Sequence, residues 1–519
     1  MLFSGARGSK VSSIWWAGIG AGVACAPLAG IDDRPCVPGC VDSTTRLVCD
    51  GERARAESCP GSNEACARPS CRAGSCGFEP ALGASCGPGG AARCNEGYAC
   101  LGPDAHLSAI LTHTCLVADD GKLWCWGENT YGELGDGTKL ARGNPVLVRG
   151  LPGPVTDVGT GYAHTCALVE GGQAYCWGNN LAAQCGTGHG SDPLLAPFRV
   201  DAGGVRFTAI AAGKAHTCAI SEDRSVYCWG IKSHGITGVE SGQCNPSTET
   251  TVAPTRVAGL DDVKAIETVK EHTCALRNSS PTMVCWGSNM RLEEGKIAYK
   301  LGPNAVDPSG KPLECSAKPV PVDLGVEVID IGMGFESTYA VDANSVAYGW
   351  GYNDRRQLGI GRSGEFVEKP ERLQFIPRDQ PDPVPFTNVR DVLRTDGRDQ
   401  CAELHSPRET SRFYCWGRDG YGELGQGKVL ENTTLLLPTE TVLPPSARNL
   451  VRGENHGCFL VGADSKHEVW CFGAGQLVAN GAARPEISSE AIPPQPEPQP
   501  VVWKPENFEA GLYDPALRE

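Results

Sequence analysis

The sequence His-Thr-Cys-Leu-Val-Ala-Asp-Asp-Gly-Lys-Leu-Trp-Cys-Trp-Gly at residues 113–127 decides the fold, because its pattern recurs along the chain. Each copy begins with His-Thr-Cys, crosses a short polar gap and ends with Cys-Trp-Gly, as at residues 164–178, 216–230 and 272–287. Weaker copies centre on Trp350, Trp416 and Phe472. A period of about fifty residues, filled with short alternating strands, is typical of a β-propeller.

A second motif follows Cys-Trp-Gly. It reads Gly-Glu-Leu-Gly-Asp-Gly-Thr at residues 132–138, with relatives at 183–188, 357–359 and 422–427. The two motifs together resemble the regulator of chromosome condensation repeats, whose units read His-Thr/Ser-x-Ala-Leu, Trp-Gly and Gln-Leu-Gly in that order. The resemblance covers roughly residues 105–505 in seven copies, and it implies an all-β, seven-bladed propeller with four antiparallel strands in each blade.

Two expectations about the ring follow from the repeats. The tryptophan of Cys-Trp-Gly, or its Phe counterpart, stands in every blade, so we expect it to pack between blades rather than to stack on a ligand. Repeat one is expected to lack a first strand, because Leu101–Asp104 directly precedes its second strand, while Pro500–Trp503 is expected to form an orphan strand. We therefore expect Val501 and Val502 to complete the blade of Trp126, so that no sheet edge is left open.

The motif cysteines are predicted to form disulfides within the blades. In the first three repeats they stand ten residues apart around a central turn, which makes them opposed neighbours on an antiparallel hairpin and places them within bonding reach. In repeat five Tyr339 and Gly349 replace both cysteines at once, as a paired loss predicts. The six predicted bridges are Cys115–Cys125, Cys166–Cys176, Cys218–Cys228, Cys274–Cys285, Cys401–Cys415 and Cys458–Cys471.

The alternative for these residues is a zinc site built from His113, Cys115 and Cys125. Repeat six argues against it, because it keeps Cys401 and Cys415 without the histidine. We therefore predict no metal and no cofactor. The histidines are expected to be structural and to hydrogen-bond the backbone near the glycine-rich strand. Cys185 is expected to be a small buried hydrophobic residue, while Cys244 and Cys315 lie in long loops and are candidates for a further pair.

Composition points to export. The chain has 519 residues, 26 of them cysteine, and a net charge of −15, which disfavours nucleic acid as a partner. Arg7 and Lys10 precede an apolar stretch at residues 14–30, as in a bacterial signal peptide. Cys25 ends a sequence that resembles a lipobox. Lipidation of Cys25, simple cleavage and an uncleaved anchor remain open, and the expected location is extracellular or the cell envelope.

Four regions are predicted. Residues 1–25 form the signal, residues 26–103 a small disulfide-rich module, residues 104–504 the propeller, and residues 505–519 a tail. The module contains ten cysteines and few large apolar residues between Cys36 and Cys100, so covalent cross-links must hold it together.

The sequence favours a non-enzymatic binding scaffold that recognises a protein or a surface glycan. It contains no Gly-x-Ser-x-Gly or His-Glu-x-x-His motif and no marked catalytic residue. A secreted propeller enzyme is the alternative, since propeller sites assemble from several blades. The resemblance also implies a second alternative, a guanine-nucleotide exchange factor-like regulator, although a shared fold does not carry the activity.

Uneven loop lengths locate the expected partner site. The segments after Trp-Gly are longest in three adjacent repeats, at residues 231–255, 288–318 and 352–384. All the extra residues are expected to follow the same strand and therefore to emerge on one side of the ring. The partner-binding candidates in these segments are Arg291, Glu293, Glu294, Lys296, Tyr299, Arg355, Arg356 and Arg362.

Overall fold

The computed structural model describes residues 105–239, 249–291, 295–377, 382–405, 411–428, 433–463, 466–474 and 495–501, together with short strands between residues 39 and 101. The chain divides into two units, residues 1–80 and residues 81–519. The first unit contains β1 (Gly39–Asp42), β2 (Thr45–Asp50), β3 (Arg53–Ser58), β4 (Ala67–Arg72) and β5 (Ser75–Pro80). The second unit opens with β6 (Ser85–Cys86), β7 (Ala92–Cys94) and β8 (Cys100–Leu101).

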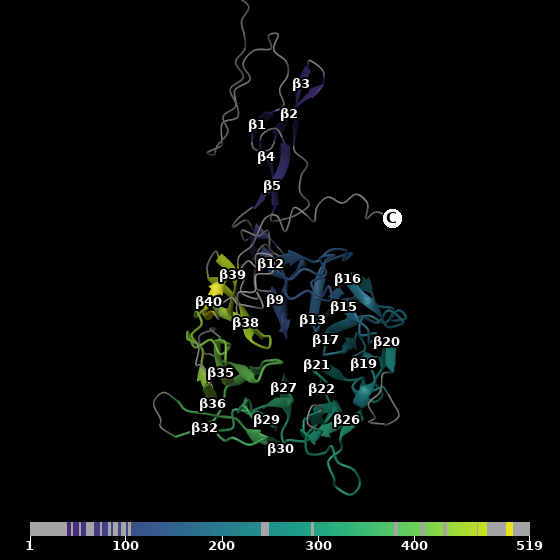
Figure 1. Cartoon of the computed structure of the whole chain (residues 1–519), viewed down its shortest axis with the longest axis vertical. Coiled ribbons are helices and arrows are strands. Elements are labelled where there is room, and N and C mark those ends of the chain that lie inside the picture. Colours follow the sequence, from purple (N-terminus) through teal and green to yellow (C-terminus); the bar gives the residue numbers. More distant parts are fainter. Residues whose placement is uncertain are drawn as a thin grey trace, which may run out of the picture. The chain divides into compact units, whose positions relative to one another are not determined.

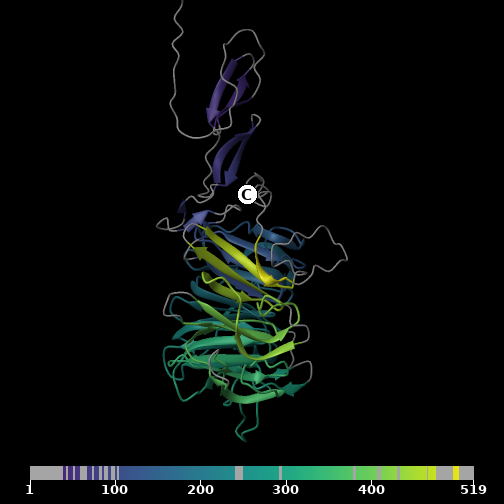
Figure 2. The same cartoon turned by 90° about the vertical axis from the view of Figure 1, so that its left-hand side faces the viewer.

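Seven four-stranded antiparallel sheets follow, as Figure 1 shows face-on and Figure 2 from the side. Blade 1 comprises β9 (His106–Ile110), β10 (His113–Val117), β11 (Leu123–Gly127) and β12 (Arg142–Leu147). Blade 2 comprises β13 (Val155–Thr160), β14 (His164–Val169), β15 (Gln173–Asn180) and β16 (Ser191–Arg199). Blade 3 comprises β17 (Phe207–Ala212), β18 (His216–Ser221), β19 (Val226–Ile231) and β20 (Thr250–Arg256). Blade 4 comprises β21 (Val263–Val269), β22 (His272–Arg277), β23 (Met283–Ser288) and β26 (Cys315–Val322).

The last three blades have the same strand order. Blade 5 comprises β27 (Val328–Gly334), β28 (Ser337–Asp342), β29 (Ala347–Tyr352) and β30 (Phe366–Arg372). Blade 6 comprises β33 (Val389–Val392), β34 (Asp399–Leu404), β35 (Arg412–Asp419) and β36 (Thr433–Glu440). Blade 7 comprises β37 (Ala447–Arg452), β38 (His456–Ala463), β39 (Lys466–Gly473) and β40 (Gln495–Pro500). Between the blades' strands lie a 3₁₀ turn (Ser233–Gly235) and two small hairpins, β24 (Met290–Arg291) with β25 (Lys296–Ile297) and β31 (Gln374–Phe375) with β32 (Val384–Pro385).

The predicted ring closure is wrong. Blade 1 has its own inner strand, β9, which a tight turn at Leu111 and Thr112 joins to β10. The C-terminal strand β40 pairs instead with β39, and the amide of Val501 donates to the carbonyl of Val469 at 2.8 Å, whereas Val502 lies outside the described residues. Because each blade starts from its own inner strand, the ring needs no borrowed strand at blade 1, and the late strand fills the outer edge of blade 7.

Side chains close the ring between blades 7 and 1. The amide of Leu107 in blade 1 donates to Oδ1 of Asn449 in blade 7 at 2.6 Å. Nε2 of His456 in blade 7 lies 2.9 Å from the hydroxyl of Thr114 in blade 1. These contacts replace the strand sharing that the sequence had suggested.

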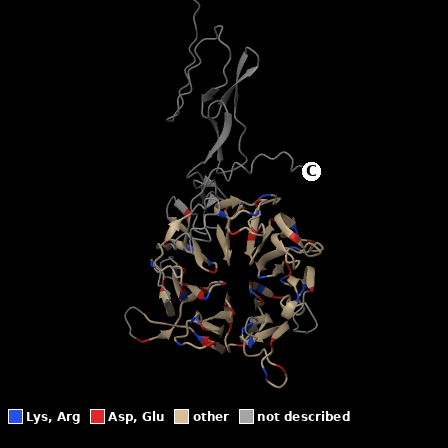
Figure 3. Ribbon diagram, viewed as in Figure 1, with Lys and Arg blue, Asp and Glu red and all other residues tan. Residues whose placement is uncertain are grey.

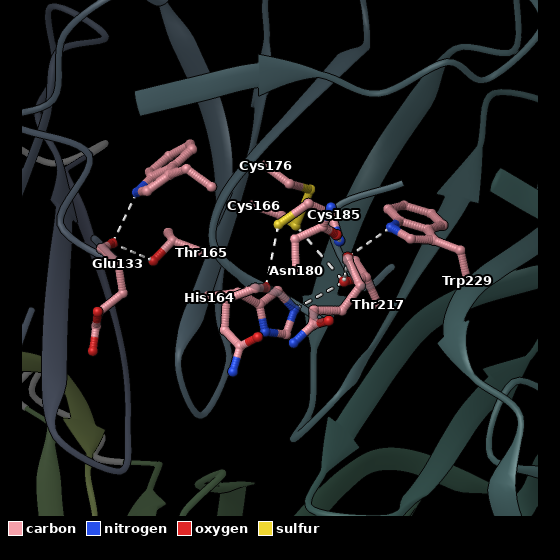
Figure 4. Close-up of a disulfide and its surroundings, with 12 residues drawn as sticks. Glu133, His164, Thr165, Cys166, Cys176, Asn180, Cys185, Thr217 and Trp229 are labelled. Carbon is pink, nitrogen blue, oxygen red and sulfur yellow. Dashed lines mark hydrogen bonds between the residues drawn. A yellow bond between two sulfur atoms is a disulfide. The ribbon is translucent and has the colours of Figure 1, made fainter. Parts of the chain in front are cut away.

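The histidines of His-Thr-Cys connect neighbouring blades. Nε2 of His164 lies 3.0 Å from the hydroxyl of Thr217 in the next blade, as Figure 4 shows. The same bond joins His113 to Thr165, His216 to Thr273 and His272 to Thr338. The expected bond from these rings to the backbone is therefore wrong: the partner is the threonine of the following repeat, brought opposite by the ring.

The tryptophan of Cys-Trp-Gly packs between blades, as expected. The indole of Trp229 donates at 2.8 Å to the carbonyl of Gln184 in the preceding blade, and the hydroxyl of Thr217 donates to the same oxygen at 2.9 Å. Trp177 and Thr165 make the matching pair of bonds to the carbonyl of Glu133. The Glu/Gln-Leu-Gly motif thus presents an acceptor to the tryptophan and threonine of the next blade.

A glycine substitution tests this contact. Gly135 has φ +66°, and a Cβ at this position would stand 2.8 Å from Nε1 of Trp177. We expect Gly135→Ala to reduce the free energy of unfolding by about 2–4 kcal/mol, from left-handed strain and overpacking together. The control is Gly137→Ala, at φ +83° with open space around the Cβ, which should cost only the strain of about 1–2 kcal/mol. Equal losses in urea unfolding of the two variants would contradict the packing role.

The structure contains the six disulfides between the opposed motif cysteines, each with a Cα–Cα distance of 4.1 Å. In blade 5 Tyr339 lies opposite Gly349, which confirms that pairing, and its hydroxyl donates to the carbonyl of Gln357 at 2.6 Å. Cys185 is buried and unbridged. Cys315 is disulfide-bonded, while Cys244 and the side chains of the ten N-terminal cysteines lie outside the described residues.

Candidate functional site

Strand direction fixes which connections share a face. Successive strands of every blade are antiparallel, so the connections from first to second strand and from third to fourth strand emerge at the same end of the ring. We call this end the variable face. Each first-to-second connection lies near the ring axis, because the first strands of neighbouring blades contact one another around it, as Figure 1 shows.

The residues of the variable face differ from blade to blade while the framework repeats. The residue after Trp-Gly is Glu128 in blade 1, Asn179 in blade 2 and Arg418 in blade 6. The residue two before the His-Thr-Cys motif varies in the same way, as with Tyr162 and Lys214. Sequence reasoning missed these positions. Their signal is variation in every copy between flanking residues that hardly change, which is what binding residues on a rigid scaffold show.

Side chains span the axis at this face. The phenol of Tyr162 in blade 2 donates to the carboxyl of Asp396 in blade 6. The guanidinium of Arg394 in blade 6 donates to the carbonyls of Thr160 and Ala212 at 2.6 and 2.5 Å. Burial raises the pKa of Asp396 to about 8. Since Arg394 and the Tyr162–Asp396 pair join opposite blades, they bridge the ring across its axis.

Below this bridge, a cavity of about 380 Å³ is lined by first-strand residues of all seven blades. The carboxylates in it also join blades. Asp157 accepts the amide of Ile210 at 2.9 Å and Asp330 accepts that of Val392 at 3.2 Å, in each case from the next blade. Burial raises the pKa of both groups. We interpret these carboxylates as structural. Within the described ranges, no group of three His, Cys, Asp or Glu residues is arranged to hold a metal ion.

Two pockets flank the axial bridge on the variable face. One, of about 410 Å³, lies across blades 1, 2 and 3 and is lined among others by Glu128, Tyr131 and Leu181. The other, of about 340 Å³, lies across blades 5, 6 and 7 and is lined among others by Arg398 and Arg418. Arg398 stands over the ring of Phe335 at 5.3 Å and Arg418 over that of Tyr421 at 5.8 Å.

A buried ion triad adjoins the bridge. Glu336 contacts the ammonium of Lys270 at 2.8 Å and also that of Lys300, and both Glu336 and Lys300 are fully buried. Burial alone would raise the pKa of Glu336, but the two ammonium groups outweigh it and hold the pKa below its ordinary value. The triad links the first-to-second connections of blades 4 and 5, so its role is structural.

The partner-binding candidates differ in their exposure to solvent. Arg291 is buried with its guanidinium 4.1 Å above the ring of Tyr352, so it is not a surface contact. Lys296, Arg355, Arg356 and Arg362 are exposed on third-to-fourth connections of blades 4 and 5, with Tyr299 half-buried beside them. Lys296 and Arg362 form ion pairs with Glu365 and Glu371. Glu293 and Glu294 lie outside the described residues.

One part of the loop prediction is wrong. Not all the added residues follow the third strand, because the hairpin of β31 and β32 follows β30, the fourth strand of blade 5. It therefore emerges on the face opposite the variable face. Lysine, arginine and acidic residues are interspersed over the blades, and neither sign covers one side of the ring in Figure 3.

Comparison with known proteins agrees with this framework. The profile of the regulator of chromosome condensation (RCC1) repeat matches residues 120–168 and 171–220, and a second profile of that repeat matches residues 155–186 and 207–236. Seven blades repeat the arrangement that these segments form. The chain is a seven-bladed propeller of RCC1 repeats.

Relatives of this RCC1-repeat propeller carry out different tasks. The Arabidopsis thaliana ultraviolet-B receptor UVR8 is 25% identical over 340 residues, 63% of this chain and 69% of the receptor. The RCC2 homolog of Danio rerio is 31% identical over 28% of this chain and 30% of its own length. The human E3 ubiquitin-protein ligase HERC2 is 30% identical over 36% of this chain, but the match spans only 4% of the ligase.

Solved structures show the same fold. Prp20p from Saccharomyces cerevisiae superposes with a TM-score of 0.58 at 18% identity, covering 77% of this chain and 88% of Prp20p. Human WBSCR16 superposes with a TM-score of 0.56 at 17% identity, covering 73% of this chain and 94% of that protein. In the part of the chain that the structure describes, no helix is long and apolar enough to cross a bilayer.

Proposed function

We propose that this RCC1-repeat propeller is a non-enzymatic scaffold that binds another protein through its variable face. The observation that carries the proposal is the contrast on this face between a repeated framework and side chains that vary among the blades. Framework residues form the hydrogen bonds between neighbouring blades, as His164, Thr217 and Trp229 do. Other residues between them, such as Leu181 and Arg418, line two pockets. Rigid walls with variable, partly apolar lining suit recognition of a protein surface.

One solved structure with this fold supports protein binding. Prp20p, which has this fold, is known for its binding to Gsp1p and histones, both proteins. We propose a different partner for this chain, located outside the cytoplasm, because its six intra-blade disulfides are stable only under oxidising conditions. A cell-envelope location, with or without a lipid on Cys25, is part of the same proposal. Catalysis has no specific observation in its favour.

Site-specific photo-crosslinking tests the proposal. A photoreactive residue at Arg355, exposed on the variable face, should capture a protein partner in the native cells, and the product should fractionate with the envelope. The control is the same residue at Glu170, exposed in the turn between β14 and β15 on the opposite face, which should capture nothing. Capture from Glu170 alone, or only in the cytosolic fraction, would contradict the proposal.

A further inference from the structure

The pocket across blades 1, 2 and 3 is built from two layers of connections. Leu111, Tyr162 and Lys214 come from the first-to-second connections and border its axial side. Tyr131 and Leu181 come from the third-to-fourth connections and border its outer side. The pocket thus extends radially from the rim of the ring to the axial bridge, and its volume of about 410 Å³ suits a long side chain with its neighbours.

The outer side of this pocket is apolar and exposed. Leu181 is 67% exposed and Tyr131 is 36% exposed, although both stand in connections that the framework holds rigidly. The amide of Leu134 donates to Oδ1 of Asn129 at 3.0 Å, and that of Cys185 donates to Oδ1 of Asn180 at 2.9 Å, so each connection is fixed from inside. Exposed apolar side chains on such rigid supports are typical of protein interfaces.

The charge of the pocket is negative. Glu128 and Glu133 both line it, and the only cation among its lining residues, Lys214, lies 3.2 Å from Glu271, which is outside the lining. Glu133 accepts the amide of Tyr131 at 2.8 Å, while the carboxylate of Glu128 forms no ion pair with any described residue. Burial, and to a smaller extent the charge of Glu128, raises the pKa of Glu133. A cation entering the pocket would relieve this repulsion.

The fold does not require an acid at this position. Asn179, Ser288 and Arg418 occupy the position of Glu128 in blades 2, 4 and 6. The pocket across blades 5 to 7 has an arginine, Arg418, at this position on the same framework. The carboxylate of Glu128 is therefore a feature of this one pocket rather than of the blade.

We propose that this pocket receives a lysine or arginine side chain of the partner protein, with the cation at Glu128 and apolar neighbours of that residue against Tyr131 and Leu181. The proposal rests on the proposed function of the variable face and names the chemistry that it recognises. Charge complementarity supports a basic side chain, and the exposed apolar border supports a protein as its source.

Peptide probes test the assignment on the full oxidised chain. We would use Ser-Gly-Leu-Arg-Leu-Gly-Ser, capped at both ends, and its versions with Lys, Gln or Glu in place of Arg, with saturation-transfer NMR as the readout. The Arg and Lys probes should bind, and the Gln and Glu probes should bind about tenfold more weakly or not at all. Glu128→Gln and Leu181→Ser should each weaken the Arg probe several-fold, while Arg418→Gln, the matched change in blade 6, should not.

Three outcomes would overturn the proposal: equal binding of the Glu and Arg probes, an unchanged affinity in Glu128→Gln, or a dimer in sedimentation that Leu181→Ser dissociates, since a second copy would then be the occupant. Among the described residues the carboxylate of Glu128 forms no hydrogen bond or ion pair, so unchanged melting temperatures should accompany these variants. If the cross-linker at Arg355 captures the partner but the peptide probes do not bind, the result supports the proposed binding function and contradicts only the assignment of this pocket.

Discussion

Reduction of the intra-blade disulfides is expected to unfold the propeller at ordinary temperature. The six bridges close loops with sequence separations of 10 to 14 residues. Loops of this length are worth about 2–3 kcal/mol each by loss of chain entropy in the unfolded state. Their sum is on the order of 12–18 kcal/mol, which matches or exceeds the whole stability of a typical domain. Circular dichroism melting with and without a thiol-free reductant measures the effect.

Removing one disulfide measures the contribution of a single bridge to the free energy of unfolding. The double variant Cys218→Ala, Cys228→Ala should lose about 2–3 kcal/mol of unfolding free energy and remain folded, because five bridges are left. Blade 5 shows that a blade can fold without a bridge when an aromatic ring fills the place, since Tyr339 there is fully buried opposite Gly349. Crossed cysteine pairs in non-reducing peptide mapping, or a melting temperature unmoved by reduction, would contradict the stabilising role.

Local patterns could be predicted from the sequence, and long-range ones could not. The pairing of Cys115 with Cys125 depends only on a hairpin whose turn is visible in the sequence, so its geometry follows from antiparallel register. The packing of tryptophan between blades follows from its presence in nearly every repeat. Ring closure, in contrast, depends on contacts such as that between Leu107 and Asn449, 342 residues apart, and no local signal reports them.

The same difference between local patterns and long-range contacts applies to the candidate site. The sequence predicts that the long connections share one face; exposed Lys296 and Arg355 lie on the variable face, whereas the hairpin of β31 and β32 follows a fourth strand and lies on the other. The sequence could not show that Arg291 is buried on Tyr352, because that contact spans two blades. It also could not show that Glu128 and Leu181 line one pocket, because their proximity is set by the angle between neighbouring blades. What the sequence did contain was the variability of these positions among otherwise constant copies.

The histidines between blades should make the propeller sensitive to acid. His164 is fully buried, and burial, followed by the charges of nearby groups, lowers its pKa to about 3. Burial likewise lowers the pKa of His113, His216 and His456 to about 3. Each ring is neutral in the folded state at pH 5, whereas in the unfolded chain it takes up a proton below about pH 6.5. The unfolded state therefore binds more protons between pH 6.5 and 3.

Stability must fall in that window as the pH falls, by about 1.4 kcal/mol per pH unit for each histidine well below pH 6.5. Buried carboxyls with raised pKa oppose this loss of stability in the wild type. Asp396, with a pKa of about 8, stabilises the fold more as the pH falls.

Comparing the wild type with a variant isolates the contribution of one histidine. His164→Gln should cost about 1 kcal/mol at pH 7.5, through the bond to Thr217, yet equal or exceed the wild type in stability near pH 5. The control is His189→Gln at an exposed position. If the free energies of unfolding of wild type and His164→Gln, measured in urea, change equally from pH 7.5 to 5, the ring of His164 is not the buried neutral group between blades that the structure indicates.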